Sequence, residues 1–166
     1  MKYVIRRRRK EDCLAIAHVV TISWNETYKG IVPDWFLDKL KTNEEERANR
    51  AMDSFEVNNN HQFVLEIDNK VVGFINLGIA LDNDFENCGE VIAFYIIGKY
   101  QKNGFGRKLI EEGIKELKSL GCDKMIIACL KGNSTNDFYK HIGGVYIKDG
   151  MYERLSLPEN IYYYEI

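Results

Sequence analysis

The sequence predicts an α/β protein built on a mixed sheet with helices on its faces. Three observations support this prediction. An apolar strand over residues 90–97 leads through a glycine-containing loop into an amphipathic helix. The nearly continuous apolar run Lys124–Leu130 has the composition of a buried central strand. Two apolar segments, His61–Ile67 and Lys70–Ala80, flank Asp68-Asn69, which is typical of a hairpin turn.

The N-terminal third predicts one strand followed by three helices. We expect a strand over Tyr3–Arg7 and a helix from Asp12 to about Tyr28, whose residues 17, 21, 24 and 28 form one stripe. A short helix fits residues 33–40, with proline in its first turn. Thr42-Asn43 has N-cap character, so a third helix is predicted from Glu44 to about Glu56, ended by residues 58–60.

The C-terminal part alternates helices and strands. Residues 81–87 are polar and predict a loop, and the amphipathic helix begins near Gly104 and ends at Gly121. Ser134-x-x-Asp137 resembles a capping box for a short helix through Ile142, which Gly143-Gly144 would stop. Two final strands are predicted over residues 145–155 and 161–166. No linker interrupts the pattern, so we expect one domain over residues 1–166.

Composition excludes several functional classes. The net charge of −2 gives no basic field, so we expect no nucleic-acid partner. We interpret the basic run Arg6–Lys10 as the end of a strand and a loop with solvated side chains. No apolar run reaches 18 residues and the N-terminus lacks the apolar region of a signal peptide, which predicts a cytoplasmic protein without a membrane partner.

The cysteine and histidine positions do not predict a metal site or disulfides. The four cysteines, at 13, 88, 122 and 129, form no Cys-x-x-Cys pair, and the three histidines are scattered. We therefore expect buried free thiols and no bound metal.

The start of the helix near Gly104 predicts an anion site. A helix N-terminus presents unpaired N–H groups and about half a positive charge. Its first charged residues here are Arg107 and Lys108, and no acid occurs before Glu111. Because cations at this end are unfavourable unless an anion binds, and because glycines admit a close backbone approach, we expect a phosphate or pyrophosphate. The glycine spacing matches neither a P-loop nor the dinucleotide fingerprint.

Two motifs carry a family resemblance. Gln101-x-x-Gly104-x-Gly106 resembles the acyl-CoA-binding motif of the GNAT superfamily of N-acetyltransferases. The segment Asn133 to Gly144, with Phe138-Tyr139 at its centre, is similar to a second GNAT signature. A third, less specific similarity starts at Trp24, so the resemblance covers nearly the whole chain. It implies a GNAT-like fold, with a central, mostly antiparallel sheet of about seven strands flanked by helices.

The resemblance also implies roles for individual residues. In several members of the family, a glutamate at the position of Glu90 serves as general base, often through water, although a solvated acid at a strand edge is an equal interpretation of Glu90. A tyrosine at the position of Tyr139 lies near the CoA sulfur in the family. The implied cofactor contacts are Ile96, Ile97, Gln101, Lys102, Asn103, Gly104, Phe105, Gly106, Arg107 and Asn133. Trp24 and Tyr28 fall where the family binds its acceptor, although the sequence favours aromatic core packing over substrate binding for most residues of this cluster. One departure is Asn136, where the family usually has a small residue beside the cofactor.

The implied function is acetyl-CoA-dependent N-acetyl transfer to a primary amine of a small molecule or peptide, by direct attack. No Ser/His/Asp or Cys/His pattern indicates a covalent enzyme intermediate. Two alternatives stay open: a CoA-binding regulatory module of the same fold without turnover, and a nucleotide-binding domain that uses the same loop for ATP. The sequence leaves both a monomer and a homodimer open.

Overall fold

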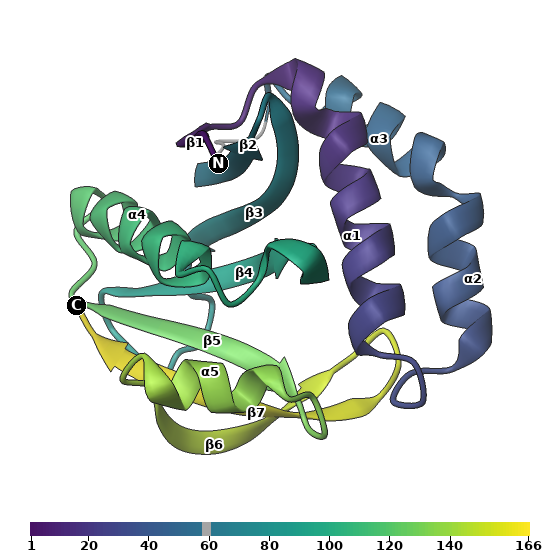
Figure 1. Cartoon of the computed structure of the whole chain (residues 1–166). Helices are drawn as coiled ribbons and strands as arrows, with labels where there is room; N and C mark the ends of the chain where they lie inside the picture. The colour runs from purple at the N-terminus through teal and green to yellow at the C-terminus, as the bar shows by residue number, and fades with distance from the viewer. Residues whose placement is uncertain (58–60) are drawn as a thin grey trace. The chain divides into compact units, whose positions relative to one another are not determined.

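The computed structural model of the chain describes residues 1–57 and 61–166, and confirms a mixed sheet flanked by helices (Figure 1). Seven strands form one sheet in the order β1-β2-β3-β4-β5-β7-β6. The elements are β1 (Tyr3–Arg7), η1 (Lys10–Asp12), α1 (Cys13–Thr27), α2 (Asp34–Thr42), α3 (Glu44–Asp53), β2 (His61–Ile67), β3 (Lys70–Ile79), β4 (Cys88–Ile96), η2 (Gly98–Tyr100), α4 (Phe105–Ser119), β5 (Lys124–Leu130), α5 (Thr135–His141), β6 (Val145–Tyr152) and β7 (Leu157–Glu165).

The chain divides into two compact units. The first unit comprises residues 1–76 and 93–113, and the second comprises residues 77–92 and 114–166. Elements β3, β4 and α4 contribute residues to both. A single domain over residues 1–166 therefore stays a prediction.

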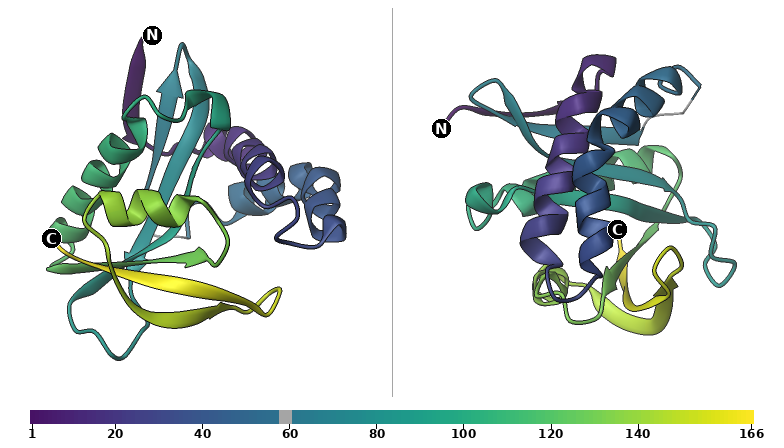
Figure 2. Two further views of the ribbon diagram at one scale, coloured as in Figure 1. Left: turned by 60° about the horizontal axis from the view of Figure 1, so that its bottom comes forward. Right: turned by 90° about the vertical axis from the view of Figure 1, so that its right-hand side faces the viewer.

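In the first unit, three helices pack together beside the first strands. Helix α3 follows directly on α2, and both helices contact α1, which lies alongside them (Figures 1 and 2). Strand β1 pairs antiparallel with β2, with Tyr3 opposite Ile67. Val19 of α1, Val64 of β2 and Phe74 of β3 form one buried cluster. This cluster attaches α1 to the strands, so the helix and strand ends of this unit have a fixed arrangement.

The basic run near the N-terminus is the end of a strand with exposed side chains at Arg7, Arg9 and Lys10, as predicted, but Arg6 and Arg8 are partly buried and bonded, which corrects the prediction for these two. The Arg6 guanidinium bonds both oxygens of Asp12, at 2.8 and 2.9 Å, and also bonds Glu66. Arg8 donates to Gln62 and lies 5.1 Å from the ring centroid of Phe55. Burial alone would raise the pKa of Asp12, but the hydrogen bond from Arg6 lowers it below its ordinary value. These arginines stabilise the link between β1, η1 and β2.

In the second unit, β5 lies between a parallel and an antiparallel neighbour. It pairs in parallel with β4 from Cys88–Lys124 to Val91–Ile127, and antiparallel with β7 along its whole length. Strand β6 completes the unit by antiparallel pairing with β7. The sheet is thus mixed, as predicted. Helix α5 contacts β5 and β7 and lies on one face of these strands (Figures 1 and 2).

Several predicted boundaries need correction. Strand β7 begins at Leu157 rather than residue 161, because Pro158 takes a strand position opposite Met151 and its carbonyl accepts the Lys131 N–H. Helix α3 ends at Asp53, three residues early, and the predicted stop at residues 58–60 lies outside the described residues. Strand β4 begins at Cys88, two residues before the prediction.

Of the predicted hairpin turn and helix cap, the structure confirms the turn and corrects the cap. Asp68 and Asn69 both have positive φ, of 48° and 62°, which confirms the hairpin between β2 and β3. The capping box at Ser134 is wrong: Ser134 is itself helical and its side chain makes no cap hydrogen bond. Instead the Asn133 side-chain oxygen accepts the Thr135 N–H at 2.9 Å and caps the start of α5.

All four cysteines are buried free thiols, as expected. Among residues 1–57 and 61–166, no helix is both long and apolar enough to cross a membrane.

Candidate functional site

The predicted anion loop lies at the surface of the first unit. Residues 101–104 are exposed, and Lys102 and Gly104 have positive φ, of 62° and 78°. A Cβ at Gly104 would meet no heavy atom within 4 Å, so the space beside this residue is open. Helix α4 begins at the next residue, Phe105, and the backbone N–H of Lys108 donates the first helical hydrogen bond, to the Gly104 carbonyl. The N–H groups of the first turn precede this bond and point out of the helix end.

The surroundings of this helix end are basic. The first turn of α4 holds no acid, and both Arg107 and Lys108 are exposed. The ammonium of Lys108 lies 5.6 Å from the ring centroid of Tyr3. Phe105 is buried, and its ring packs edge-on against the same tyrosine at 5.1 Å. The side chain of Phe105 therefore anchors the helix start, which leaves its backbone N–H as its available group.

Two side chains of the motif hold the loop itself. The Gln101 side chain donates to the Ile96 carbonyl at 2.7 Å, which ties the loop to the end of β4. The Asn103 side chain donates to the Gln101 carbonyl at 2.9 Å. A glutamine at the first motif position thus shapes the loop through the strand that precedes it, and the backbone N–H groups of the loop are the candidate donors to an anion.

The end of β4 is fixed from several directions. The Ile97 N–H donates to the Val72 carbonyl of β3, and the Ile97 carbonyl accepts the Tyr100 N–H. A Cβ on Gly73 would lie 2.8 Å from the Ile96 side chain, so only glycine fits there. Because backbone N–H groups alternate along a strand, the N–H of Ile96 points away from β3.

Strand β4 carries an extra residue relative to β3. The Ala80 N–H donates to the Cys88 carbonyl, whereas the Ile97 N–H donates to the Val72 carbonyl. Between these two hydrogen bonds the chain of β4 covers nine residues, from 88 to 97, whereas the chain of β3 covers eight, from 72 to 80. One residue of β4 forms a β-bulge, a feature that is frequent beside active sites and that reverses which backbone groups face the neighbouring strand.

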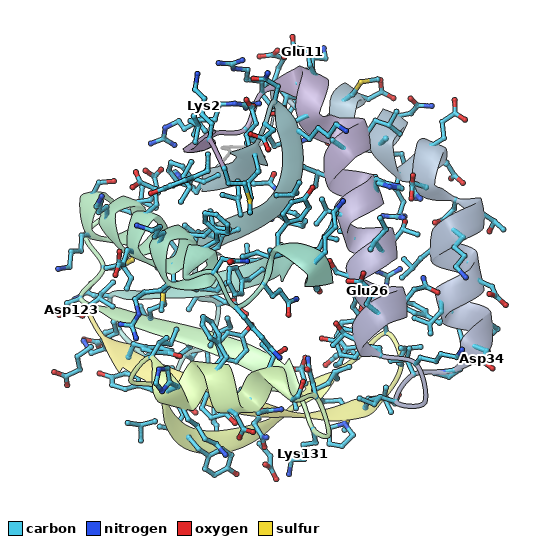
Figure 3. The ribbon with its side chains drawn as sticks, in the orientation of Figure 1. Lys2, Glu11, Glu26, Asp34, Asp123 and Lys131 are labelled. Atoms are coloured by element: carbon cyan, nitrogen blue, oxygen red, sulfur yellow. The ribbon has the colours of Figure 1, made fainter. Side chains whose placement is uncertain are left out.

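Glu26 of α1 is a neighbour of this strand end that sequence reasoning missed. Its carboxylate accepts the Gly98 N–H at 2.8 Å, and Figure 3 shows it on the side of α1 toward the end of β4. A Cβ on Gly98 would lie 2.9 Å from this carboxylate. No spacing rule links residues 26 and 98, so only the folded chain reveals the contact.

Trp24 and Tyr28 lie in the core of the first unit. They are 6% and 8% exposed, their ring centroids are 4.4 Å apart, and Trp24 also packs on Phe36. The structure thus supports the packing interpretation for both rings, and their substrate-binding role stays a prediction.

In the second unit, Glu90 is a half-buried carboxylate on β4. It lies opposite Ile126 of β5, which in turn lies opposite Tyr163 of β7, so the three side chains share one face of the sheet. Burial raises the pKa of Glu90, and the nearby charge of Asp82 adds to the rise. Lys148 bonds Asp82 at 2.6 Å and compensates the charge of that acid.

Glu159 is a second half-buried carboxylate on this face. Glu159 pairs with Leu130 of β5, which lies four residues after Ile126 and therefore on the same face of the strand. Burial together with the charge of Glu90 raises the pKa of Glu159. Sequence reasoning missed Glu159 because the predicted last strand began two residues after it.

Tyr139 belongs to the opposite face. Its ring centroid lies 6.0 Å from that of Tyr162, which neighbours Tyr163 along β7 and therefore points the other way. Tyr139 is 5% exposed, and Asn133 is buried at the start of the same helix. The second unit thus carries a perturbed carboxylate on one face and a buried phenol on the other.

The side chain of Asn136 points into the protein. Its amide donates to the carbonyls of Leu130 and Asn133, and its oxygen accepts from the side chains of Asn160 and Tyr162. The side chain of Asn136 is therefore bonded to β5, to the turn before α5 and to β7. Within residues 1–57 and 61–166, no group of three or more His, Cys, Asp or Glu side chains is arranged to hold a metal ion.

Comparison with known proteins gives concordant matches. The model of the acetyltransferase (GNAT) family matches residues 23–143. A curated relative, the uncharacterized N-acetyltransferase YuaI of Bacillus subtilis (strain 168), is 28% identical over 138 residues, which cover 82% of this chain and 76% of the relative.

Solved structures share the fold. The PaiA N-acetyltransferase of Thermoplasma acidophilum, in complex with coenzyme A, has a TM-score of 0.79 at 23% identity, with 100% of both chains covered. YncA of Salmonella typhimurium, with its cofactor acetyl-CoA, has a TM-score of 0.68 at 17% identity, covering 99% of this chain and 94% of that one.

The environment of Glu90 predicts a gain in stability when its charge is removed. Since the pKa of Glu90 is raised on folding, the folded state binds its proton more tightly, and stability falls as pH rises from the ordinary glutamate value through the raised one. Glu90→Gln should therefore unfold at a higher temperature than the parent at pH 7, with the gain vanishing toward pH 4. Thermal unfolding across pH tests this, with exposed Glu86→Gln as the control. A variant that is less stable at pH 7 would contradict it.

Proposed function

Because the chain belongs to the GNAT acetyltransferase family, we propose that it transfers an acetyl group from acetyl-CoA to a primary amine by direct attack. The observation that carries the proposal is the exposed, basic loop at the start of α4, whose Gly104 has open space beside it. The acceptor is a small molecule or a peptide. The cytoplasmic location stays a prediction from the sequence, which leaves both a monomer and a homodimer open.

In this proposal the loop binds the CoA pyrophosphate. The N–H groups of residues 103–107 donate to phosphate oxygens, and the N-terminus of α4 adds its partial positive charge. Lys102 and Arg107 supply mobile cations at the same end of the helix. Gln101 acts through its bond to the Ile96 carbonyl, which fixes the loop relative to the end of β4. Asn133 contacts the pantetheine arm from the start of α5, as the family resemblance implies.

The Ile96 N–H is the proposed donor to the acetyl carbonyl. Acyl transfer places negative charge on that oxygen, and a donor held in advance stabilises it by about 3–4 kcal/mol. Of the two amides predicted from the sequence, that of Ile97 already donates to Val72. The Ile96 amide, which points away from β3, is therefore the one assigned to the carbonyl, and Ile97 is assigned to holding the strand end.

The two faces of the second unit supply the proton transfers. Glu90 accepts a proton from the amine, directly or through water, as the nitrogen bonds to the acetyl carbon. When the carbon–sulfur bond breaks, the Tyr139 hydroxyl donates a proton or a hydrogen bond to the departing thiolate. A raised pKa brings a carboxyl closer to the working range of a general base, so the environment of Glu90 favours this role.

A binding measurement followed by a turnover assay tests the proposal. Acetyl-CoA, CoA, ATP and NAD are compared by thermal shift, and thiol release from acetyl-CoA is then measured across amines, amino acids, polyamines, antibiotics and peptides. We expect acetyl-CoA to stabilise the protein and at least one amine to release thiol. Binding without release by any amine would favour the regulatory-module alternative, and stabilisation by ATP alone would contradict the proposal.

Gly104→Val tests the anion loop. The new side chain would fill the open space beside the residue and should lower acetyl-CoA affinity at least tenfold, about 1.4 kcal/mol, by calorimetry. Gly121→Val is the matched control, because Gly121 also has positive φ, of 87°, and open space around its Cβ. It should cost similar stability but leave the affinity unchanged. Unchanged affinity in folded Gly104→Val would remove the loop from the site.

Glu90→Gln keeps the side-chain shape and removes the proton acceptor. Loss of a general base typically costs about 10²–10⁴-fold in kcat, with acetyl-CoA binding retained. The kcat of the parent should fall as pH drops through the raised pKa of Glu90, and the variant should lose this dependence. Parental kcat in the variant across pH 6–9, about the range of the assay, would assign the base to another group or to bulk water.

Tyr139→Phe removes only the hydroxyl. A phenol in water has a pKa of about 10, so phenols are donors at neutral pH, while a thiolate already leaves readily. We therefore expect kcat to fall by roughly 10- to 100-fold, with affinity and stability little changed. Full activity of the Phe variant, together with unfolding of Tyr139→Ala, would mean that the ring only packs in the core.

A further inference from the structure

Asn136 is a buried side chain with every polar site in use. It is 9% exposed, and its amide donates to the Leu130 carbonyl at 2.9 Å and the Asn133 carbonyl at 2.7 Å. Its oxygen accepts from the Tyr162 hydroxyl at 2.7 Å and the Asn160 side chain at 3.0 Å. A buried amide is costly unless it is satisfied, and four hydrogen bonds satisfy this one completely. Asn136 thereby joins the end of β5, the turn before α5 and strand β7.

Strand β7 holds the rest of α5 as well. The Tyr164 hydroxyl donates to the Tyr139 carbonyl at 2.8 Å. Gly144 makes this bond feasible, because a Cβ there would lie 2.5 Å from the Tyr164 hydroxyl. The ring of Tyr162, which is 1% exposed, packs beside that of Tyr139. Both the start of α5 and its Tyr139 carbonyl are thus bonded to tyrosines of β7.

The helix needs this external support. Helix α5 has seven residues, and helices shorter than about 12 residues are marginal on their own. Its orientation is therefore set by tertiary contacts. Burial raises the pKa of Tyr162, and the nearby Cys129 thiol adds to the rise, so the hydroxyl remains a donor at neutral pH.

We propose that Asn136 and Tyr162 are positioning residues that hold α5 so that the Tyr139 hydroxyl meets the leaving sulfur. This inference rests on the proposed role of Tyr139 as hydrogen-bond donor. Misplacing a reacting group by about 1 Å can cost on the order of 10²-fold in rate, so a small rotation of α5 would matter. A small apolar residue at position 136 would leave the Tyr162 hydroxyl and two carbonyls without this partner, and α5 would lose its bond to β7 at that end.

A double-mutant cycle between positions 162 and 139 tests the inference. Tyr162→Phe removes one hydroxyl and keeps the ring, so it carries little folding risk. Tyr146→Phe is the matched control, since Tyr146 donates to Asp149 on the exposed strand β6. Asn136→Ala is made as a second probe, and folding is checked by circular dichroism and thermal unfolding. The kcat and KM for acetyl-CoA are measured in the parental and Tyr139→Phe backgrounds.

We expect Tyr162→Phe to lower kcat by about tenfold in the parental background, within the range of coupling between contacting residues, with KM for acetyl-CoA changed less than about threefold. In the Tyr139→Phe background the same substitution should change kcat by less than about twofold. Tyr146→Phe should change neither. An equal fall in both backgrounds, or no fall in the parent, would overturn the positioning role. If Tyr139→Phe alone is fully active, the proposed donor itself fails, which is a separate result.

Discussion

The hydrogen bond from the Ile97 N–H to the Val72 carbonyl is the constraint on which the candidate chemistry depends. It decides which backbone groups at the end of β4 face β3 and which face away. The β-bulge upstream makes this orientation differ from that at the start of the strand. Gln101 and Glu26 then hold the adjoining carbonyl and amide through their side chains. An amide held in this way needs no reorganisation when charge develops on an acetyl oxygen.

The glycines near the end of β4 determine how closely other groups can approach its backbone. Gly73 lets β3 approach Ile96, and Gly98 leaves room for the Glu26 carboxylate. Gly104 differs from both, because the space beside it is open rather than filled by protein. Two glycines thus allow close packing, and the third leaves a vacant approach to backbone N–H groups. That difference supports the assignment of the anion to the loop at the start of α4.

In the second unit, β7 contributes side chains beside both residues that are proposed to transfer protons. Its alternating residues reach both faces of the sheet, so Tyr162 and Tyr164 support α5 while Tyr163 lies on the face of Glu90. The half-buried carboxylate of Glu90 and the buried phenol of Tyr139 thus belong to opposite faces of these strands. The raised pKa of Glu90 also means that the charged base opposes stability, which is typical of functional carboxylates.

Much of this architecture could be predicted from local sequence patterns. The strands Tyr3–Arg7, His61–Ile67 and Lys124–Leu130 have the predicted bounds, because each is an apolar run with clear turn signals or polar flanks. Strand β7 was predicted too short, since Pro158 and polar neighbours hide a strand that pairs with β6 and β5. The side-chain contacts of Glu26, Gln101 and Asn136 could not be predicted, because they join residues without any local periodicity. The orientation of the Ile96 amide likewise follows a one-residue shift between β3 and β4 that no residue type predicts.

Residue-resolved hydrogen exchange, with and without a saturating acetyl-CoA analogue that resists hydrolysis, tests the central claim most directly. The Ile97 amide should be protected in both states, because it donates to Val72. The Ile96 amide should exchange faster in the free protein and become protected when the analogue binds. Equal protection of Ile96 in both states, or protection on binding at Ile97 alone, would contradict the assignment of the Ile96 N–H as the donor to the acetyl carbonyl.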